Sequence, residues 1–171
     1  MHAHHPAKPS VLAIAFGAMA LASVGNAPAA EIPPEGPIES TFTWTSRQEA
    51  MPTAGGMEAV TGEAWLVLTA AGAGSILDRL GARCLYAGEQ KPDGSEYGIR
   101  GRCRFVDADG DQIFETFEET HAGGTGRLDG GTGKFSGITG EHTITSEYFG
   151  SPAEGVYQGI GRKKGSYKLA K

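Results

Sequence analysis

Hydrophobic and polar residues alternate along the chain from Ser40 onward, in short runs that glycine and aspartate interrupt. Alternation with a period of two is the pattern of a β-strand that has one buried face and one exposed face. No stretch of useful length has the period of an amphipathic helix. We therefore predict eight strands, over residues 40–48, 57–69, 81–89, 96–106, 111–121, 125–129, 136–149 and 154–168.

Glycine is abundant and spread between these runs, with 27 glycines in the chain. Evenly spaced glycines suit many short strands joined by tight turns. Eight strands without helical cover favour closure, because a barrel removes the exposed edges that an open sheet would leave. The predicted fold class is all-β, a single closed antiparallel β-barrel of about eight strands.

The turn at residues 91–95 (Lys-Pro-Asp-Gly-Ser) joins two predicted strands. Proline presets φ and glycine accepts a positive φ, which favours a hairpin. With Asp93 and Gly94 at its centre, Cys84 lies directly opposite Cys103, close enough for a disulfide. An even number of cysteines in an exported chain also favours a disulfide. A three-residue loop would shift this register by one, and two separate buried thiols are the alternative.

The second hairpin turns at residues 107–111 (Asp-Ala-Asp-Gly-Asp). With its aspartate–glycine pair at the centre, arginines of one strand face glutamates of the next across the ladder. The opposite face carries the fewest charges and includes Phe105 and Phe114, so we assign it to the interior. Glu118 lies on the same face, which makes it an interior carboxylate.

Alternation places His142, Ser146 and Tyr148 on one face of the run 136–149. If that face points inward, an imidazole, a hydroxyl and a phenol lie beside Glu118. The alternative is a partly exposed histidine and a tyrosine whose ring fills the core. The predicted ligand-binding residues are Glu118, Tyr148, His142, Ser146, Phe105 and Phe114.

Residues 1–29 predict a secretory signal peptide. An uncharged apolar run, 11–24, precedes the small residues Ala27-Pro28-Ala29, and it is shorter than a membrane span requires. An uncleaved anchor is the alternative. Cleavage near Ala29 or Ala30 leaves a periplasmic or secreted protein without a stable membrane span. Residues 30–39 then form a proline-rich leader, which we expect to be exposed, and residues 40–171 the barrel domain.

The charge balance argues against two classes of partner. The chain has 15 Lys and Arg against 20 Asp and Glu, a formal net charge of −5. Nucleic acid and anionic lipid surfaces need a basic footprint, so neither is expected as a partner.

Two patterns resemble metal sites. The aspartates of residues 107–111 imitate calcium-loop spacing, but Gln112 stands where an EF-hand needs glycine, and strand-like alternation follows. A hairpin turn made soluble by aspartates is the favoured interpretation, with weak calcium binding as the alternative. A zinc site on the cysteines would require both His121 and His142. We expect no metal and no cofactor.

Residues 130–140 (Gly-Gly-Thr-Gly-Lys-Phe-Ser-Gly-Ile-Thr-Gly) resemble the glycine-rich strand turn of the allene oxide cyclase and dirigent barrels. Together with Cys84, residues 101–103, the 107–111 turn and residues 165–169, they also resemble a group of small exported bacterial proteins. The resemblance covers about residues 80–169 and implies a closed eight-stranded antiparallel barrel. It carries over no catalytic residue, because no other pocket motif of these families has a match in the chain.

The favoured hypothesis for function is a barrel that binds a small, largely apolar ligand in its interior without transforming it. One rival is an isomerase or cyclase that uses Glu118 as acid and base, with Tyr148 or His142 orienting the substrate. The other is a structural or interaction module with a filled core. A cavity with convergent polar groups favours the first two hypotheses, and a filled interior favours the third.

Overall fold

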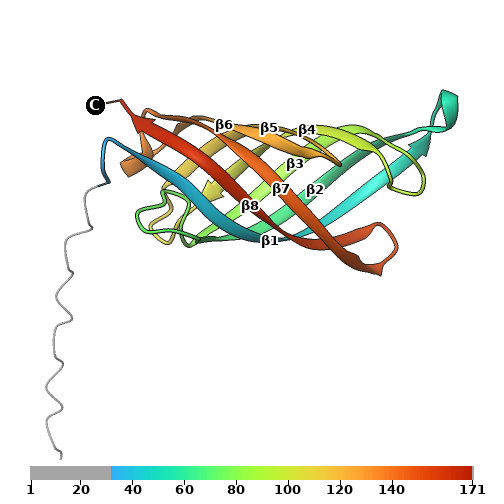
Figure 1. Ribbon diagram of the computed structural model, residues 1–171, viewed down its shortest axis with the longest axis horizontal. Coiled ribbons are helices and arrows are strands. Elements are labelled where there is room, and N and C mark those ends of the chain that lie inside the picture. The colour runs from blue at the N-terminus through green and yellow to red at the C-terminus, as the bar shows by residue number, and fades with distance from the viewer. Residues whose placement is uncertain (1–31, 171) are drawn as a thin grey trace, which may run out of the picture. The chain divides into compact units, whose positions relative to one another are not determined.

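The computed structural model describes residues 32–170, in which eight antiparallel strands close into a barrel (Figure 1). Each strand pairs with its neighbour in sequence, and the last pairs with the first. The strands are β1 (Glu35–Pro52), β2 (Glu58–Ala70), β3 (Leu80–Gln90), β4 (Tyr97–Val106), β5 (Gln112–Thr120), β6 (Gly123–Gly131), β7 (Ile138–Ala153) and β8 (Val156–Leu169). Single 3-10 turns, η1 (Ala54–Gly56) and η2 (Gly133–Phe135), lie in two connections. The predicted fold class is confirmed.

The barrel begins earlier than predicted. β1 starts at Glu35 and Ile38 has no exposed surface, so the second half of the predicted leader 30–39 belongs to the first strand. The prolines of this segment obscured its strand-like alternation of hydrophobic and polar residues. Pro37 nevertheless pairs within the β1–β8 ladder. The predicted signal peptide and its cleavage point lie outside the described residues.

One row of cross-strand neighbours measures the stagger of the barrel. It leaves β1 at Ile38, passes through β8, β7, β6, β5, β4, β3 and β2, and returns to β1 at Gln48. The stagger is therefore 48 − 38 = 10 residues. An eight-stranded barrel of this kind is filled by its own side chains or holds one small ligand.

The β3–β4 hairpin has the predicted register. Cys84 pairs with Cys103, and the two form a disulfide with an Sγ–Sγ distance of 2.02 Å. The loop is wider than two residues, because the Lys91 N–H donates to the Glu96 carbonyl at 2.8 Å. It is nevertheless centred as expected, so the pairing is unchanged. Disulfides are typical of proteins from oxidising compartments.

The β4–β5 hairpin differs from the prediction by one residue. Val106 pairs with Gln112, which leaves five residues, 107–111, in a loop where we expected two. The Asp107 carboxylate holds this wider loop by accepting hydrogen bonds from two backbone N–H groups within it, at 2.9 and 3.0 Å. The predicted turn is confirmed, and its predicted register is wrong.

This slip moves every side chain of β5 to the other face of the sheet. Glu118 and Phe114 lie on the outer face, where Phe114 is 40% exposed, so both predictions of an interior position are wrong. Glu115 and Phe117 face inward in their place. On β4, where the prediction did not depend on the slipped loop, Phe105 is buried as expected.

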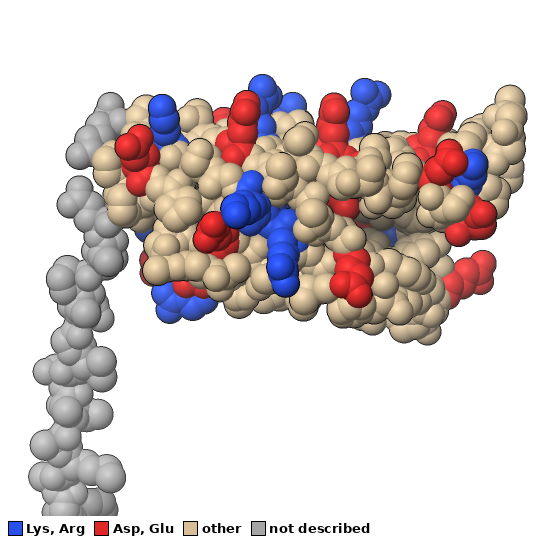
Figure 2. Space-filling model, in the orientation of Figure 1, with Lys and Arg blue, Asp and Glu red and all other residues tan. Residues whose placement is uncertain are grey.

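The two ends of the barrel are built differently. At the end where the chain enters β1, which we call the closed end, the β2–β3 loop and η2 bury Ile76, Leu77 and Phe135. Inward-facing Ser40 ties that loop down by donating to the Leu77 carbonyl at 2.5 Å. The opposite end, which we call the open end, carries the β1–β2, β3–β4, β5–β6 and β7–β8 hairpin loops. Charges of both signs are spread over the outer surface seen in Figure 2.

Candidate functional site

The interior changes character along the barrel. Side chains near the closed end are apolar and have no exposed surface, namely Ile38, Leu68, Leu77, Phe105, Ile113 and Ile138. Side chains that face inward near the open end are mostly aromatic or polar and are half-buried, namely Trp44, Gln48, Tyr86, Gln90, Tyr97, Ile99, Glu119 and Tyr157. A buried charged cluster separates the two halves.

That cluster consists of Glu115 from β5, His142 from β7 and Lys163 from β8. Their side chains are at most 2% exposed. The Lys163 ammonium donates to both carboxylate oxygens of Glu115, at 2.7 and 2.9 Å. His142 Nε2 lies 3.0 Å from Glu115 Oε2 and 3.2 Å from Lys163 Nζ. The carboxylate is therefore held from two sides inside the barrel.

Burial alone would raise the pKa of Glu115, but Lys163 and His142 outweigh it and hold the pKa below its ordinary value. For His142, burial dominates over the neighbouring carboxylate and lowers the pKa, which favours a neutral imidazole. His142 Nε2 is within hydrogen-bond distance of both neighbours, so it donates to Glu115 in one tautomer of the neutral ring and accepts from Lys163 in the other. In either tautomer Nδ1 is buried without a hydrogen-bond partner. The cluster is thus a Lys163–Glu115 ion pair supported by a neutral histidine.

Aromatic rings and glycines surround the cluster. Lys163 Nζ lies 5.5 Å from the centre of the Phe105 ring and 5.7 Å from that of Phe42, within the range of cation–π attraction. A Cβ on Gly126 would overlap the His142 ring, and a Cβ on Gly161 would overlap the Phe42 ring. These glycines are required by close packing of large side chains against the inner wall.

In the open half, side chains from neighbouring strands form a hydrogen-bonded chain. The Tyr86 hydroxyl donates to Gln48 at 3.3 Å, the Gln48 amide donates to Gln90 at 2.9 Å, and Gln90 donates to Glu58 at 3.0 Å. Burial is the main cause of a raised pKa at Tyr86. The polar side chains of this wall therefore hydrogen-bond to one another.

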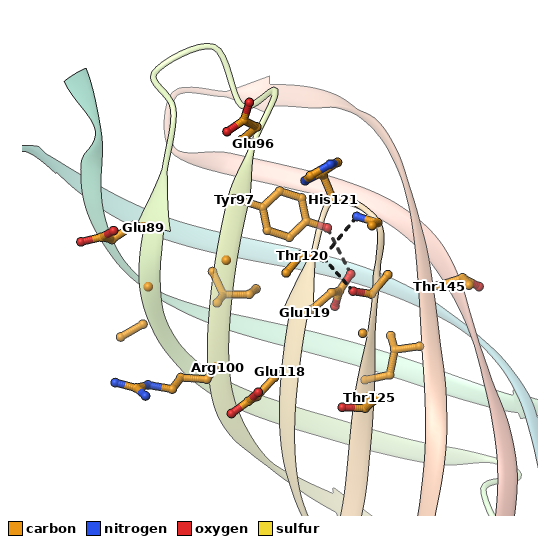
Figure 3. A pocket seen from close by; sticks show the side chains of 18 of the residues that line it. Glu89, Glu96, Tyr97, Arg100, Glu118, Glu119, Thr120, His121, Thr125 and Thr145 are labelled. Carbon is orange, nitrogen blue, oxygen red and sulfur yellow. Dashed lines mark hydrogen bonds between the residues drawn. The ribbon is translucent and has the colours of Figure 1, made fainter. Parts of the chain in front are cut away.

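On the other wall, Tyr97 of β4 and Glu119 of β5 point toward one another (Figure 3). The Tyr97 hydroxyl donates to the carboxylate at 3.3 Å. Burial, followed by the charge of Glu119, raises the pKa of Tyr97 well above its ordinary value, so the phenol stays protonated. The pair offers a ligand a carboxylate whose second oxygen is not engaged by Tyr97.

Trp44 of β1 also faces inward in this half and is half-buried. Its indole Nε1 is buried and has no hydrogen-bond partner. A Cβ on Gly159 of β8 would lie 2.6 Å from the indole ring, so this glycine leaves the space that the ring occupies. A buried donor without an acceptor is unfavourable, and a ligand atom that accepts from it would remove the cost.

A hollow of about 1380 Å³ opens at this end, around the short β5–β6 hairpin. Its lining includes inward-facing Tyr97, Ile99 and Glu119, and also outward-facing Arg100 and Glu118. Arg100 and Glu118 pair with one another on the outer face of the β4–β5 ladder, whereas Tyr97 faces inward. The volume therefore includes space outside the barrel as well as its mouth.

The structure brings together only part of the predicted site. His142 is buried beside Glu115, and Phe105 is buried beside Lys163. Ser146 and Tyr148 continue the inward register of β7, opposite glycines of β8, but both are exposed near the open end. The Tyr148 ring centre lies 6.0 Å from that of Tyr157. Glu118 and Phe114 are on the outer surface and belong to no interior site.

Sequence reasoning missed Glu115 and Lys163. Lys163 lies in the run Arg162-Lys163-Lys164, which has the appearance of a solvated charged segment. Strict alternation with the neighbouring glycines and Tyr167 of β8 would have placed Lys163 inside. For Glu115, the missing information was the length of the preceding loop.

No group of three His, Cys, Asp or Glu side chains within residues 32–170 is arranged to hold a metal ion. Over the same residues, no helix has the length and apolar character needed to cross a membrane. No protein-family model matches the chain, and no curated protein matches its sequence.

Proposed function

We propose that this barrel binds one small molecule in the open half of its interior and does not transform it. The observation that carries the proposal is the difference in exposure between inward-facing side chains. Those near the closed end have no exposed surface, whereas Trp44, Tyr86 and Tyr97 face inward and are half-buried. Partly accessible aromatic side chains around a few polar groups are typical of small-molecule sites.

The chemistry of the wall suggests the kind of ligand. Aromatic rings favour a flat or aliphatic body, and the unpaired Trp44 Nε1 favours an acceptor atom on it. The sequence suggested a largely apolar ligand. The tyrosines and glutamines of the open half favour an amphipathic one, with a polar group directed at Trp44.

Binding is favoured over catalysis by the state of the interior acid. Both oxygens of Glu115 are engaged by Lys163 within 2.9 Å, and one of them also lies 3.0 Å from His142. Along β5, Phe117 and Glu119 lie between this carboxylate and the open end. A carboxylate held in this way supports packing better than proton transfer to a ligand.

The two tryptophans of the chain provide a matched test, because Trp44 faces inward and Trp65 faces outward. The fluorescent probe 1-anilinonaphthalene-8-sulfonate combines aromatic rings with a sulfonate acceptor. We expect it to bind saturably at one site. Trp44→Phe, which removes the indole donor, should weaken binding about three- to tenfold. Trp65→Phe should leave the affinity unchanged.

Equal effects of the two substitutions, or probe uptake that does not saturate, would contradict an interior site. Native mass spectrometry of the protein purified from its own host is the second measurement. We expect a co-purifying mass, which would identify a natural ligand, and less of it in Trp44→Phe.

A further inference from the structure

Two carboxylates face the interior of the open half without a cation beside them. Glu58 of β2 and Glu119 of β5 have the inward register of their strands and are half-buried. Glu58 accepts a hydrogen bond from Gln90 at 3.0 Å, and Glu119 accepts one from Tyr97 at 3.3 Å. Both donors are neutral. Within residues 32–170 neither carboxylate forms an ion pair.

The interior has no basic side chain to spare for them. Among the inward-facing side chains of the eight strands, Lys163 is the only lysine or arginine. Its ammonium lies within 2.9 Å of both carboxylate oxygens of Glu115, so its charge is already compensated. A partly buried carboxylate without a cation is unfavourable, and a bound cation offsets that cost.

The loops around the mouth carry the same sign of charge. The four hairpin loops of the open end contain the acidic residues Asp93, Glu96 and Glu154, and Lys91 is their only lysine or arginine. Lys91 is itself paired with Glu96. Acidic side chains gather at this end, on the right in Figure 2. A negative potential at the entrance of a site attracts cations and repels anions.

Glu119 and Trp44 lie on opposite walls of the barrel at the same height. β1 and β5 are four strands apart in either direction around the barrel. The row of cross-strand neighbours from Trp44 passes through β2, β3 and β4 and reaches β5 at Ile113. Half of the stagger of 10 residues separates Ile113 from the true level of Trp44 on β5, which is therefore about five residues further on, next to Glu119.

We propose that the ligand of the open half is an organic cation, whose ammonium group binds to Glu119 and whose body lies between this carboxylate and Trp44. The inference rests on the interior site proposed above and adds the charge of its ligand. The ammonium donates a charge-assisted hydrogen bond to the carboxylate oxygen that Tyr97 does not engage. The Tyr97 ring beside it adds cation–π attraction. An acceptor on the body meets the indole Nε1 of Trp44.

The first test compares two probes that differ only in charge. Dansylcadaverine has a naphthalene ring, a sulfonamide acceptor and a terminal primary ammonium, and its N-acetyl derivative has the same body without the charge. Fluorescence titration of the full protein measures both affinities. We expect the ammonium probe to bind about tenfold more tightly, with a smaller difference at high salt. Equal affinities in the parent protein would overturn the proposal without any variant.

The second test moves the charge of the wall. Glu119→Gln keeps the shape of the side chain and should lower the affinity for dansylcadaverine about five- to tenfold, while the N-acetyl derivative changes less than about twofold. The same variant should bind the anionic 1-anilinonaphthalene-8-sulfonate more tightly, because a repelling charge is removed. Opposite changes for the two charged probes exclude a loss of folding as their cause.

The matched control is Glu118→Gln, which removes the same charge from the outer face of the same strand. It should change the affinity for each probe less than about twofold, because an exposed charge without contact to the ligand is screened. An equal effect of Glu118→Gln and Glu119→Gln would mean that the general field of the mouth, and not contact with Glu119, selects the cation. That result would contradict the proposal.

The outcomes also separate this inference from the interior site itself. The interior site stands and the cationic ligand is wrong if the sulfonate and the N-acetyl probe bind saturably and depend on Trp44 while the ammonium gives no advantage. If none of the three probes binds saturably, both proposals fail.

Discussion

The two halves of the barrel interior have the same backbone architecture and different contents. In the closed half, loops fold inward and bury Leu77 and Phe135 among strand residues with no exposed surface. In the open half, the strands continue past the β5–β6 hairpin, Trp44 and Tyr97 face inward and are half-buried, and Tyr97 lines the hollow at the mouth. One end of this barrel therefore supplies most of the apolar burial. The other end is consequently free to keep polar groups that a core would exclude.

The Glu115–His142–Lys163 cluster lies where these halves meet. Buried ion pairs contribute little net stability, because desolvation offsets their attraction. Removing one partner is costly, since the other charge is then left uncompensated. The cluster therefore makes the boundary between the halves sensitive to single substitutions.

Breaking this cluster should give the largest effect. Lys163→Met removes the cation and leaves Glu115 buried, at a cost of about 3–5 kcal/mol in the free energy of unfolding. Urea denaturation measures it. The double variant Lys163→Met/Glu115→Leu removes both charges and should recover most of the loss. A double variant as unstable as the single one would show that the pair is not the cause.

A matched pair of truncations compares the halves directly. Leu77→Ala leaves a cavity under the closed end and should cost about 2–5 kcal/mol. Ile99→Ala, at a half-buried position of the open half, should cost roughly 1–2 kcal/mol. The measurement is again the unfolding free energy in urea. Equal losses would mean that the open half is packed as densely as the closed half, against the proposed binding site.

Acid should lower the stability of the folded protein through this cluster. The pKa of His142 is lowered from 6.5 in the folded protein, so the unfolded chain binds more protons just below that pH. The contribution of His142 to the free energy of unfolding is therefore fully present above about pH 6.5. It decreases as the pH falls through the pKa that His142 has in the folded protein. The lowered pKa of Glu115 acts in the same direction at lower pH, below its unfolded value. Denaturation midpoints between pH 7 and pH 4 measure this slope.

The control for that slope is His121→Asn, at the exposed tip of the β5–β6 hairpin. This variant should keep the parent's dependence of the denaturation midpoint on pH. His142→Asn should reduce that dependence in the upper part of the pH range. A profile that depends on His121 instead would exclude the interior cluster as its source.

The smallest effect is expected in the open half. Tyr97→Phe removes one hydrogen bond to Glu119 near the barrel mouth, at a cost of about 0.5–1 kcal/mol. Thermal denaturation should show a change of only a few degrees. A loss comparable to that of Leu77→Ala would place Tyr97 in the structural core rather than in a binding region.

Much of the fold followed from local pattern. Alternation and turn residues predicted all eight strands, and the Asp93–Gly94 turn predicted the pairing of Cys84 with Cys103. Phe105 was placed inside by the same alternation. These features depend on neighbours in sequence, because strand parity and a centred loop are both local properties. His142 was likewise identified from its own strand.

The local sequence pattern could not predict which glutamate of β5 faces the interior. Its identity depends on whether the 107–111 loop contains two residues or five, and the Asp107 carboxylate decides that by binding backbone groups across the loop. Shifting the pairing of β5 with β4 by one residue exchanges Glu118 for Glu115 inside the barrel. Nothing in the alternation of β5 distinguishes the two registers, since both faces contain phenylalanine and glutamate.

Lys163 shows the same limit over a longer distance. Its partner Glu115 lies 48 residues away in the chain, and the two meet only because the barrel closes. Composition, parity and turn chemistry determine the strands and their local pairing, and these can be obtained from sequence. Barrel closure and stagger determine which charges share the interior, because they bring together residues that no local pattern relates.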